Sequence, residues 1–348
     1  MQNIKYSFGS DYLEGCHPNI LDNMQQINHT QQHGYGEDDY SIEARNILYK
    51  ELNTEKSSIY FVAGGTLANI IIASACLRPH EAVISASTGH INTHEAGAIE
   101  SVGHKIIAVE TDNGKLTVFD IQSELDKHTL GPHVVRPRMV YISNSTELGT
   151  VYSRKELKKL YDFCKLNNLI LFADGARLGA ALCTKDNDLA MEDMVSYTDI
   201  FYIGGTKNGA MLGEAIVINN ENLKYDFDFY IKQKGALLSK GSLLGIQFLT
   251  LFTDKLFYKL AYHANAMAER ITTALSNNGV KFLVESKTNQ IFPILPDSII
   301  DDLMHDYGFY IWEQVDKESS AIRLVCSWAT PEDIVDEFID DLLKLINK

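Results

Sequence analysis

Short apolar runs alternate with helix-spaced apolar patterns over residues 55–220. The short runs predict seven strands, in the segments 58–65, 81–87, 104–110, 138–144, 169–179, 199–205 and 214–219. The periodic patterns predict helices at 41–52, 66–77, 94–103 (closed by Gly103), 119–128 and 153–168 (capped by Ser153). Because strands that alternate with helices are typical of buried parallel sheets, we expect an α/β fold with a mostly parallel seven-stranded sheet.

The pattern changes after about residue 220. Residues 235–279 read as helices with one break marked by glycine, and a last helix starts at Thr330-Pro331. A shorter α+β segment lies between them, with apolar runs at 280–286, 291–296 and 321–328. We therefore expect an N-terminal segment that packs on one or both domains, a large domain and a smaller C-terminal α+β domain, over residues 1–39, 40–245 and 246–348.

Composition narrows the class of protein. The chain has 348 residues, of which 45% are hydrophobic, and a net charge of -15, which argues against a nucleic-acid binder. The five cysteines are scattered without a Cys-x-x-Cys pair, as in proteins of a reducing compartment. The N-terminus is polar, and the longest apolar run is shorter than the ~18 residues that span a bilayer. We expect a soluble cytoplasmic enzyme without a membrane segment.

Lys207 stands in "GGTKNG", directly after the apolar run 199–205, with glycines at 204, 205, 209 and 213. A solvated surface lysine is the ordinary interpretation. Glycines, however, let a backbone approach a ligand closely, and a desolvated lysine forms Schiff bases. The spacing excludes a Walker phosphate loop.

Several polar residues follow predicted strands, at the edge where open α/β sheets bind ligands. Asp174 either caps the next helix or holds a proton on a buried heterocyclic nitrogen, and Arg177 follows one helical turn later. The Gly64-Gly65-Thr66 turn either caps a helix or binds a phosphate at the helix N-terminus. Asn144 ends the predicted strand 138–144.

His90, His94 and Glu95 lie close together in "GHINTHEAGA". The spacing is not that of a His-Glu-x-x-His zinc site and no third ligand is apparent, so we expect no metal. A satisfied structural histidine is the ordinary alternative to a ring that stacks on a flat cofactor. Arg323 lies inside the apolar run "IRLV", where an arginine needs an ion-pair partner or a ligand carboxylate.

In this order, the pieces "SDYLEG", "YGED", "GGTLAN", "GHINTHEAGA", "DGARLGAA", "GGTKNGAMLG" and "IRLV" resemble the threonine aldolase and β-eliminating lyase family. That family has fold type I, a large domain with a smaller C-terminal domain, and depends on pyridoxal 5'-phosphate (PLP). The resemblance implies a small amino acid as substrate and a homodimer or homotetramer with shared sites.

The resemblance also implies residue roles. Lys207 matches the Schiff-base lysine, Asp174 the partner of the pyridine nitrogen, His90 the stacked histidine, and Gly64, Gly65 and Thr66 the phosphate turn, with Thr206 and Asn144 also at the cofactor. Arg177 matches an arginine at the cofactor hydroxyl or the substrate carboxylate. Arg323 matches a carboxylate ligand, and Ser10 and Glu95 match polar residues on the substrate side. Lys240 falls where the family has a basic residue that reaches a neighbouring subunit's phosphate.

Three departures from the family pattern stand out. Thr206 replaces the usual serine before the lysine, and the phosphate turn reads Gly-Gly-Thr instead of Ser-Gly-Thr. In "ISNSTELG", Thr146 stands where threonine aldolases carry a histidine near the substrate hydroxyl. His90 or Glu95 is then the candidate base for that hydroxyl proton.

The resulting hypothesis is retro-aldol cleavage of L-threonine or L-allo-threonine to glycine and an aldehyde. Another PLP-dependent β-eliminating lyase or an aminotransferase is the first alternative. A catalytically silent binding relative is the second.

Overall fold

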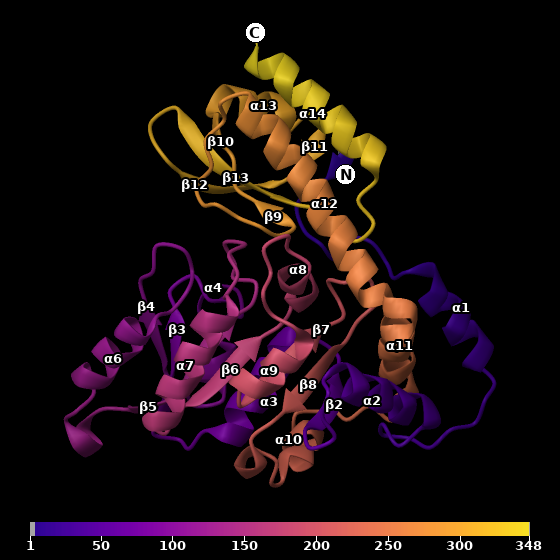
Figure 1. The fold of residues 1–348 in the computed structure, drawn as a ribbon, viewed down its shortest axis with the longest axis vertical. Coiled ribbons are helices and arrows are strands. Elements are labelled where there is room, and N and C mark those ends of the chain that lie inside the picture. The colour runs from indigo at the N-terminus through magenta and orange to yellow at the C-terminus, as the bar shows by residue number, and fades with distance from the viewer. Residues whose placement is uncertain (1–3, 348) are drawn as a thin grey trace.

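A seven-stranded sheet forms the centre of the larger part of the molecule (Figure 1). The structure, a computed structural model, describes residues 4–347. The strand order is β2-β8-β7-β6-β5-β3-β4, and only β8 runs antiparallel to its neighbours. The strands are β2 (Ser58–Val62), β3 (Glu81–Ala86), β4 (Ile106–Val109), β5 (Arg136–Ser143), β6 (Ile170–Asp174), β7 (Ile200–Gly204) and β8 (Glu214–Ile218). The predicted mostly parallel seven-stranded sheet is therefore confirmed.

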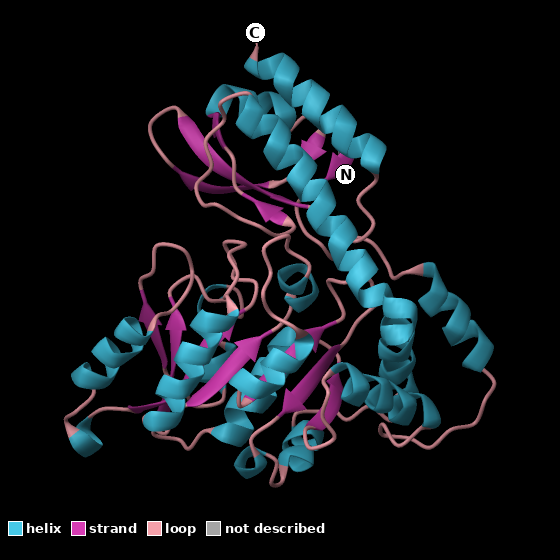
Figure 2. Cartoon of the chain, in the orientation of Figure 1, coloured by secondary structure: helices cyan, strands magenta, loops and turns pink. Residues whose placement is uncertain are grey.

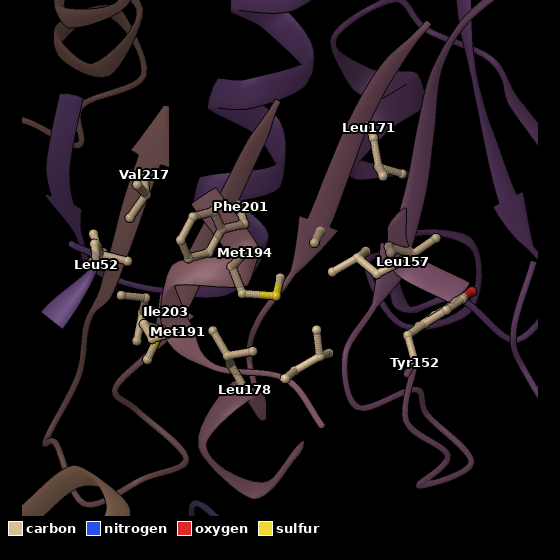
Figure 3. Close-up of a cluster of buried hydrophobic side chains, with 14 of the residues drawn as sticks. Leu52, Tyr152, Leu157, Leu171, Leu178, Met191, Met194, Phe201, Ile203 and Val217 are labelled. Atoms are coloured by element: carbon tan, nitrogen blue, oxygen red, sulfur yellow. The ribbon is translucent and has the colours of Figure 1, made fainter. Parts of the chain in front are cut away.

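Helices cover both faces of this sheet, because its strands bury side chains on both sides. Along β7, Phe201 and Ile203 point to one core, while Ile200 and Tyr202 point to the other. Figure 3 shows part of the first core. The helices on that face are α1 (Pro18–Ile27), α2 (Asp39–Glu51), α6 (Val118–Lys127), α7 (Arg154–Leu166), α8 (Leu178–Leu182), α9 (Met191–Tyr197) and α11 (Ser242–Phe252). The opposite face carries α3 (Gly65–Cys76), α4 (His90–Thr93), α5 (Ala98–Ser101) and α10 (Phe227–Gln233).

A second, smaller body of strands and helices stands above the carboxyl edge of the large sheet (Figure 2). Its sheet has the order β10-β13-β12, with β9 also paired to β13. Its elements are β9 (Gln290–Ile291), β10 (Ile294–Pro296), α13 (Asp297–Leu303), β11 (Tyr307–Gly308), β12 (Tyr310–Gln314), β13 (Ser319–Val325) and α14 (Glu332–Ile346). The long helix α12 (Leu256–Asn277) leads into it from the large body.

The N-terminal segment connects both bodies, as expected. Strand β1 (Tyr6–Ser7) pairs in parallel with β11 of the small body. Ten residues later, the backbone N–H of His17 donates to the Gly209 carbonyl of the large body at 2.9 Å. Residues 8–16 therefore cross between the two bodies.

Helix ends follow their capping residues. Ser153 and Glu156 form a capping box at the start of α7, as the Ser153 cap predicted. The predicted helix 94–103 is wrong: two short helices, α4 and α5, flank the left-handed residues Ala96 and Gly97.

The predicted glycine break within residues 235–279 is also wrong. Helices α11 and α12 are separated at Thr253–Lys255, where Asp254 and Lys255 take the left-handed conformation. The expected domain boundary at residue 245 falls within α11, whose Phe248 and Leu251 join the large-body core. The boundary itself stays a prediction.

Candidate active site

A cavity of about 240 Å³ opens at the carboxyl edge of the large sheet. Eight of the residues predicted from the sequence line it together: Gly64, Gly65, Thr66, His90, Asp174, Arg177, Thr206 and Lys207. The parallel strands bring these residues to one edge although they span more than 140 positions of the chain. Ser10, Glu95, Asn144, Lys240 and Arg323 are not part of the lining.

Lys207 follows β7 and reaches into the cavity. Burial, and next the positive charge of Arg177, lower the pKa of Lys207. Its Nζ atom lies 5.9 Å from the centre of the Tyr12 ring, which also lines the cavity. An amine with a lowered pKa is more often neutral at physiological pH, so it is a better nucleophile than a surface lysine.

Asp174 ends β6 and is fixed from two sides. Its Oδ2 atom accepts a 2.6 Å hydrogen bond from the Tyr141 hydroxyl, and its Oδ1 accepts the N–H of Ala176 at 2.9 Å. Burial, and next the nearby Asp174 charge, raise the pKa of Tyr141 well above its usual value. The phenol therefore stays a donor, and the Asp174 carboxylate keeps a fixed orientation toward the cavity.

The N-terminus of α3 forms one end of the cavity. Its N-cap, Gly64, has an extended backbone and supplies no side-chain cap, so the first N–H groups of this twelve-residue helix have no side-chain acceptor. A Cβ atom at Gly65 would lie 3.0 Å from the Tyr202 hydroxyl, which accounts for a glycine there. Thr206, two residues after the end of β7, also lines this space.

Arg177 is held by a buried carboxylate that the sequence did not point to. Its Nε and Nη2 atoms donate to Asp11 at 2.7 and 3.0 Å, and Asn289 donates to the same carboxylate at 2.9 Å. Burial acts against both charges, but the pairing outweighs it, so the pKa of Asp11 is lowered and that of Arg177 is raised. Asp11 thus takes two of the five N–H donors of Arg177 and offsets its positive charge within the protein.

Arg323, by contrast, has a free donor. Its Nη2 donates to the Gly9 carbonyl at 3.2 Å, while its buried Nε has no partner. The guanidinium lies 5.3 and 5.4 Å from the ring centres of Tyr310 and Trp312. Ser10, the residue after Gly9, has a buried hydroxyl that also lacks a partner. Unpaired buried donors are costly, so both groups fit a site that a ligand completes.

His90 and Glu95 form a pair at the side of the cavity. The Nδ1 atom of His90 lies 2.8 Å from Oε1 of Glu95, which also accepts a 2.6 Å hydrogen bond from the amide of Asn69. The Glu95 side chain is fully buried behind the imidazole. A carboxylate in this place favours a proton on Nδ1 and leaves Nε2 as an acceptor.

In the segment "ISNSTELG", which departs from the family pattern, Ser145 faces the cavity and Thr146 does not. The hydroxyl of Thr146 is bonded to that of Thr150 at 2.7 Å and lies outside the cavity lining. Ser145 lines the cavity, and its buried hydroxyl has no partner. The Nδ2 of Asn144 is likewise buried without a partner, while its Oδ1 accepts the N–H of Tyr152 at 3.2 Å.

Two acidic residues in the cavity lining were not predicted from the sequence. Glu147 accepts the Ser143 hydroxyl at 2.7 Å and the backbone N–H of His90 at 2.9 Å, and burial raises its pKa. Glu214 begins β8, and burial raises its pKa to about 8. An acidic residue at the first position of an otherwise apolar strand, as in "EAIVI", was the signal for Glu214.

Lys240 is exposed and precedes Gly241, which lies against the turn at Gly36. A Cβ atom at Gly241 would lie 2.3 Å from the backbone nitrogen of Gly36, so this position has no room for a side chain. Among residues 4–347, no group of three or more His, Cys, Asp or Glu side chains is arranged to hold a metal ion. Nor does any helix in that range have both the length and the apolar character needed to cross a membrane.

Known proteins are similar to this chain in sequence and in fold. The model of a family described as β-eliminating lyase matches residues 8–297. A low specificity L-threonine aldolase of a Pseudomonas strain is 32% identical over 98% of both chains, and that of Pseudomonas aeruginosa is 31% identical over 96% of both.

Solved structures of known proteins have the same fold as this chain. A threonine aldolase of Leishmania major superposes with a TM-score of 0.96 at 44% identity, over 98% of this chain and 99% of that one. An aspartate aminotransferase of Thermus thermophilus superposes with a TM-score of 0.72 at 14% identity, over 99% of this chain and 92% of that one, a likeness of fold alone. The predicted fold type I is confirmed, and the chain belongs to the β-eliminating lyase family.

Proposed function

We propose that this protein is a PLP-dependent lyase that cleaves a β-hydroxy-α-amino acid, such as L-threonine or L-allo-threonine, to glycine and an aldehyde. The observation that carries the proposal is one cavity that contains a lysine of lowered pKa, a fixed carboxylate and an uncapped helix N-terminus. The likeness to threonine aldolases over the full chain supports the choice of reaction.

The residues present fit PLP. The N–H groups of Gly65 and Thr66 and the hydroxyl of Thr206 suit a phosphate. Asp174 would pair with the ring nitrogen and keep it protonated, and the Tyr141 hydroxyl would hold Asp174 in that orientation. Lys207 would bond covalently to the cofactor. When bound, PLP supplies a ring that takes up the electrons of the bond broken at Cα.

The free donors of Arg323 and Ser10 suit the carboxylate of an amino acid. Since Arg177 is already paired with Asp11, we assign the substrate carboxylate to Arg323 and a positioning role to Arg177. The aromatic side chains of Tyr310 and Trp312 restrict the orientation of the Arg323 guanidinium. The substrate carboxylate can then approach the guanidinium best from one direction.

His90 is the group that we propose for the hydroxyl proton of the substrate. With Nδ1 bonded to Glu95, its Nε2 can accept a proton, while Glu95 stabilises the charge that results. Glu95 itself is then a positioning residue and not the base. The hydroxyl of Thr146 is occupied by Thr150, which is a further reason to look to His90.

The test is a product assay with purified protein and PLP. L-threonine, L-allo-threonine and phenylserine should each be supplied, and glycine and aldehyde should be released. Binding of PLP without cleavage of any of the three would contradict the aldolase reaction. Pyruvate from serine would then indicate an eliminating lyase, and a keto-acid-dependent product an aminotransferase. Protein that takes up no PLP would indicate a silent relative.

We also propose a homodimer or homotetramer in the cytoplasm. The exposed position of Lys240 supports its predicted reach to the phosphate of a neighbouring subunit. The five free cysteines support a reducing compartment.

A further inference from the structure

Glu214 opens β8 between the ends of two other strands. In the sheet register it lies opposite Val62, the last residue of β2, and opposite Gly204, the last residue of β7. Figure 1 shows β8 between these two strands. The Glu214 carboxyl therefore lies between the segment that leads into α3 and the segment that leads to Lys207.

Those two segments are the ones that we assign to the cofactor phosphate. Gly64, Gly65, Thr66 and Thr206 line the cavity together with Glu214. A phosphate monoester carries close to two negative charges at neutral pH. An ionised carboxylate in this place would repel it, and every other group assigned to this end of the cavity is a hydrogen-bond donor.

The surroundings of Glu214 offset a negative charge only in part, because burial outweighs the groups that would stabilise it. The residue is 4% exposed, and its Oε2 atom accepts the N–H of Gly205 at 3.1 Å, while the Thr206 hydroxyl is a second donor to this carboxyl. Within residues 4–347, no lysine, arginine or histidine nitrogen makes an ion pair with it. The titratable groups that face it are Lys207, Asp174 and Tyr202. Burial raises the pKa of Glu214 to about 8, although the Thr206 hydroxyl and Lys207 act in the opposite direction.

We propose that Glu214 keeps its proton when the site is filled and donates a hydrogen bond through it to the phosphate of the cofactor. Glu214 is then a positioning residue that makes cofactor binding weaken in alkaline solution. A bound dianion strengthens this arrangement, since negative charge nearby favours the neutral carboxyl. The inference rests on the proposed function, because it takes the phosphate of PLP as the anion.

The experiment compares Glu214→Gln and Glu214→Ala with the wild type. The apoproteins are titrated with PLP and with pyridoxal, which lacks the phosphate, between about pH 7 and pH 9.5, and binding is followed by visible absorbance. We expect E214A to bind PLP about tenfold or more weakly at pH 7, and E214Q, whose amide still donates, to bind like the wild type. Above about pH 8 the wild type should lose about tenfold in PLP affinity per pH unit relative to E214Q.

The ratio to E214Q cancels the titration of the phosphate, and pyridoxal, which also bonds to Lys207, reveals any change in the titration of that lysine. Pyridoxal should bind all three proteins alike. Glu81→Gln is the matched control, since it changes a buried carboxyl at the start of β3, on the opposite edge of the same sheet, and should leave PLP affinity unchanged.

Two results would overturn the inference. One is an equal loss of affinity for PLP and pyridoxal in E214A, which would mean a structural effect. The other is the same pH dependence in E214Q as in the wild type, which would mean an ionised Glu214 that pairs with a cation, for example from a second subunit. Failure of the wild type to bind PLP at all would contradict the proposed function instead, so the two failures are distinguishable.

Discussion

At the scale of single residues, Lys207 should be the point at which the cofactor is attached. Reduction with borohydride should fix PLP covalently to the wild type, and peptide mapping should place it on the peptide that contains residue 207. Lys207→Ala should carry no such adduct and should lose its aldolase activity. Lys185→Ala, at an exposed lysine paired with Glu269, is the control and should retain both. An adduct in K207A would refute the assignment.

Arg323 should govern substrate affinity more than turnover. Loss of a charge-assisted hydrogen bond costs about 1.5–3 kcal/mol, so Arg323→Ala should raise KM for L-threonine by about 10- to 100-fold. The fall in kcat should be smaller, because the cofactor contacts remain. Steady-state kinetics with threonine measure both quantities. A fall in kcat at unchanged KM would show that the carboxylate binds elsewhere.

The pKa of Glu214 has a consequence for the stability of the apoprotein. This pKa rises from 4.5 to about 8 on folding. Between pH 4.5 and about pH 8, the folded protein therefore keeps a proton that the unfolded chain has released. The contribution of Glu214 to the free energy of unfolding is therefore full below about pH 4.5 and is lost as pH rises to about 8. Relative to E214Q, the wild type should lose up to about 4 kcal/mol between pH 5 and pH 8 and little beyond, in urea unfolding of the apoproteins. A constant difference would contradict the raised pKa.

Several site residues could be predicted from the sequence, and others could not. Asp174 and Lys207 follow apolar strands, so the strand direction alone brings them to the ligand-binding edge. The partner of Arg177 could not be predicted, because Asp11 lies 166 positions away and comes from the segment that crosses between the two bodies. The pattern also does not show that Glu95 lies behind His90, since that depends on where the short helices α4 and α5 turn.

At the scale of elements, the close approach of β6 and β7 sets the distance between Asp174 and Lys207. A Cβ atom at Gly175 would lie 1.8 Å from the backbone oxygen of Tyr202, which cannot move aside. Gly175→Ala should lower the free energy of unfolding by at least about 2 kcal/mol and weaken PLP binding. Chemical denaturation and absorbance titration measure the two effects. Gly15→Ala, where no atom lies within 4 Å, should change neither, and equal behaviour of the two variants would contradict this view.

Element types were predictable where the pattern was long and periodic. The seven strands and helix α7 are examples, since buried strands and an amphipathic helix with a capping box leave clear signals. The break between α11 and α12 left none, because Asp254 and Lys255 adopt a conformation that is usual for glycine. Short helices such as α4 and α5 are held by tertiary packing instead of by their own periodicity.

At the scale of the whole molecule, sites shared between subunits predict complementation. If Lys240 of one subunit serves the site of its neighbour, Lys207→Ala and Lys240→Ala should each be impaired alone. A mixed dimer of the two variants contains one site with both lysines intact. Subunit exchange between them should therefore restore about a quarter of wild-type activity under random pairing. No recovery, with exchange verified by mass spectrometry, would place Lys240 outside its neighbour's site.

The crossing of residues 8–16 between the two bodies bears on how the gene is engineered. Strand β1 is anchored on β11, and a few residues later Asp11 is bonded to Arg177 beside Lys207. A purification tag fused close to residue 4 would be joined, through β1, to the segment 8–16 that reaches Arg177 in the active-site cavity. The end of α14, by contrast, lies far from the carboxyl edge of the large sheet (Figure 1). Fusions at the carboxyl end are therefore the safer choice for producing the enzyme.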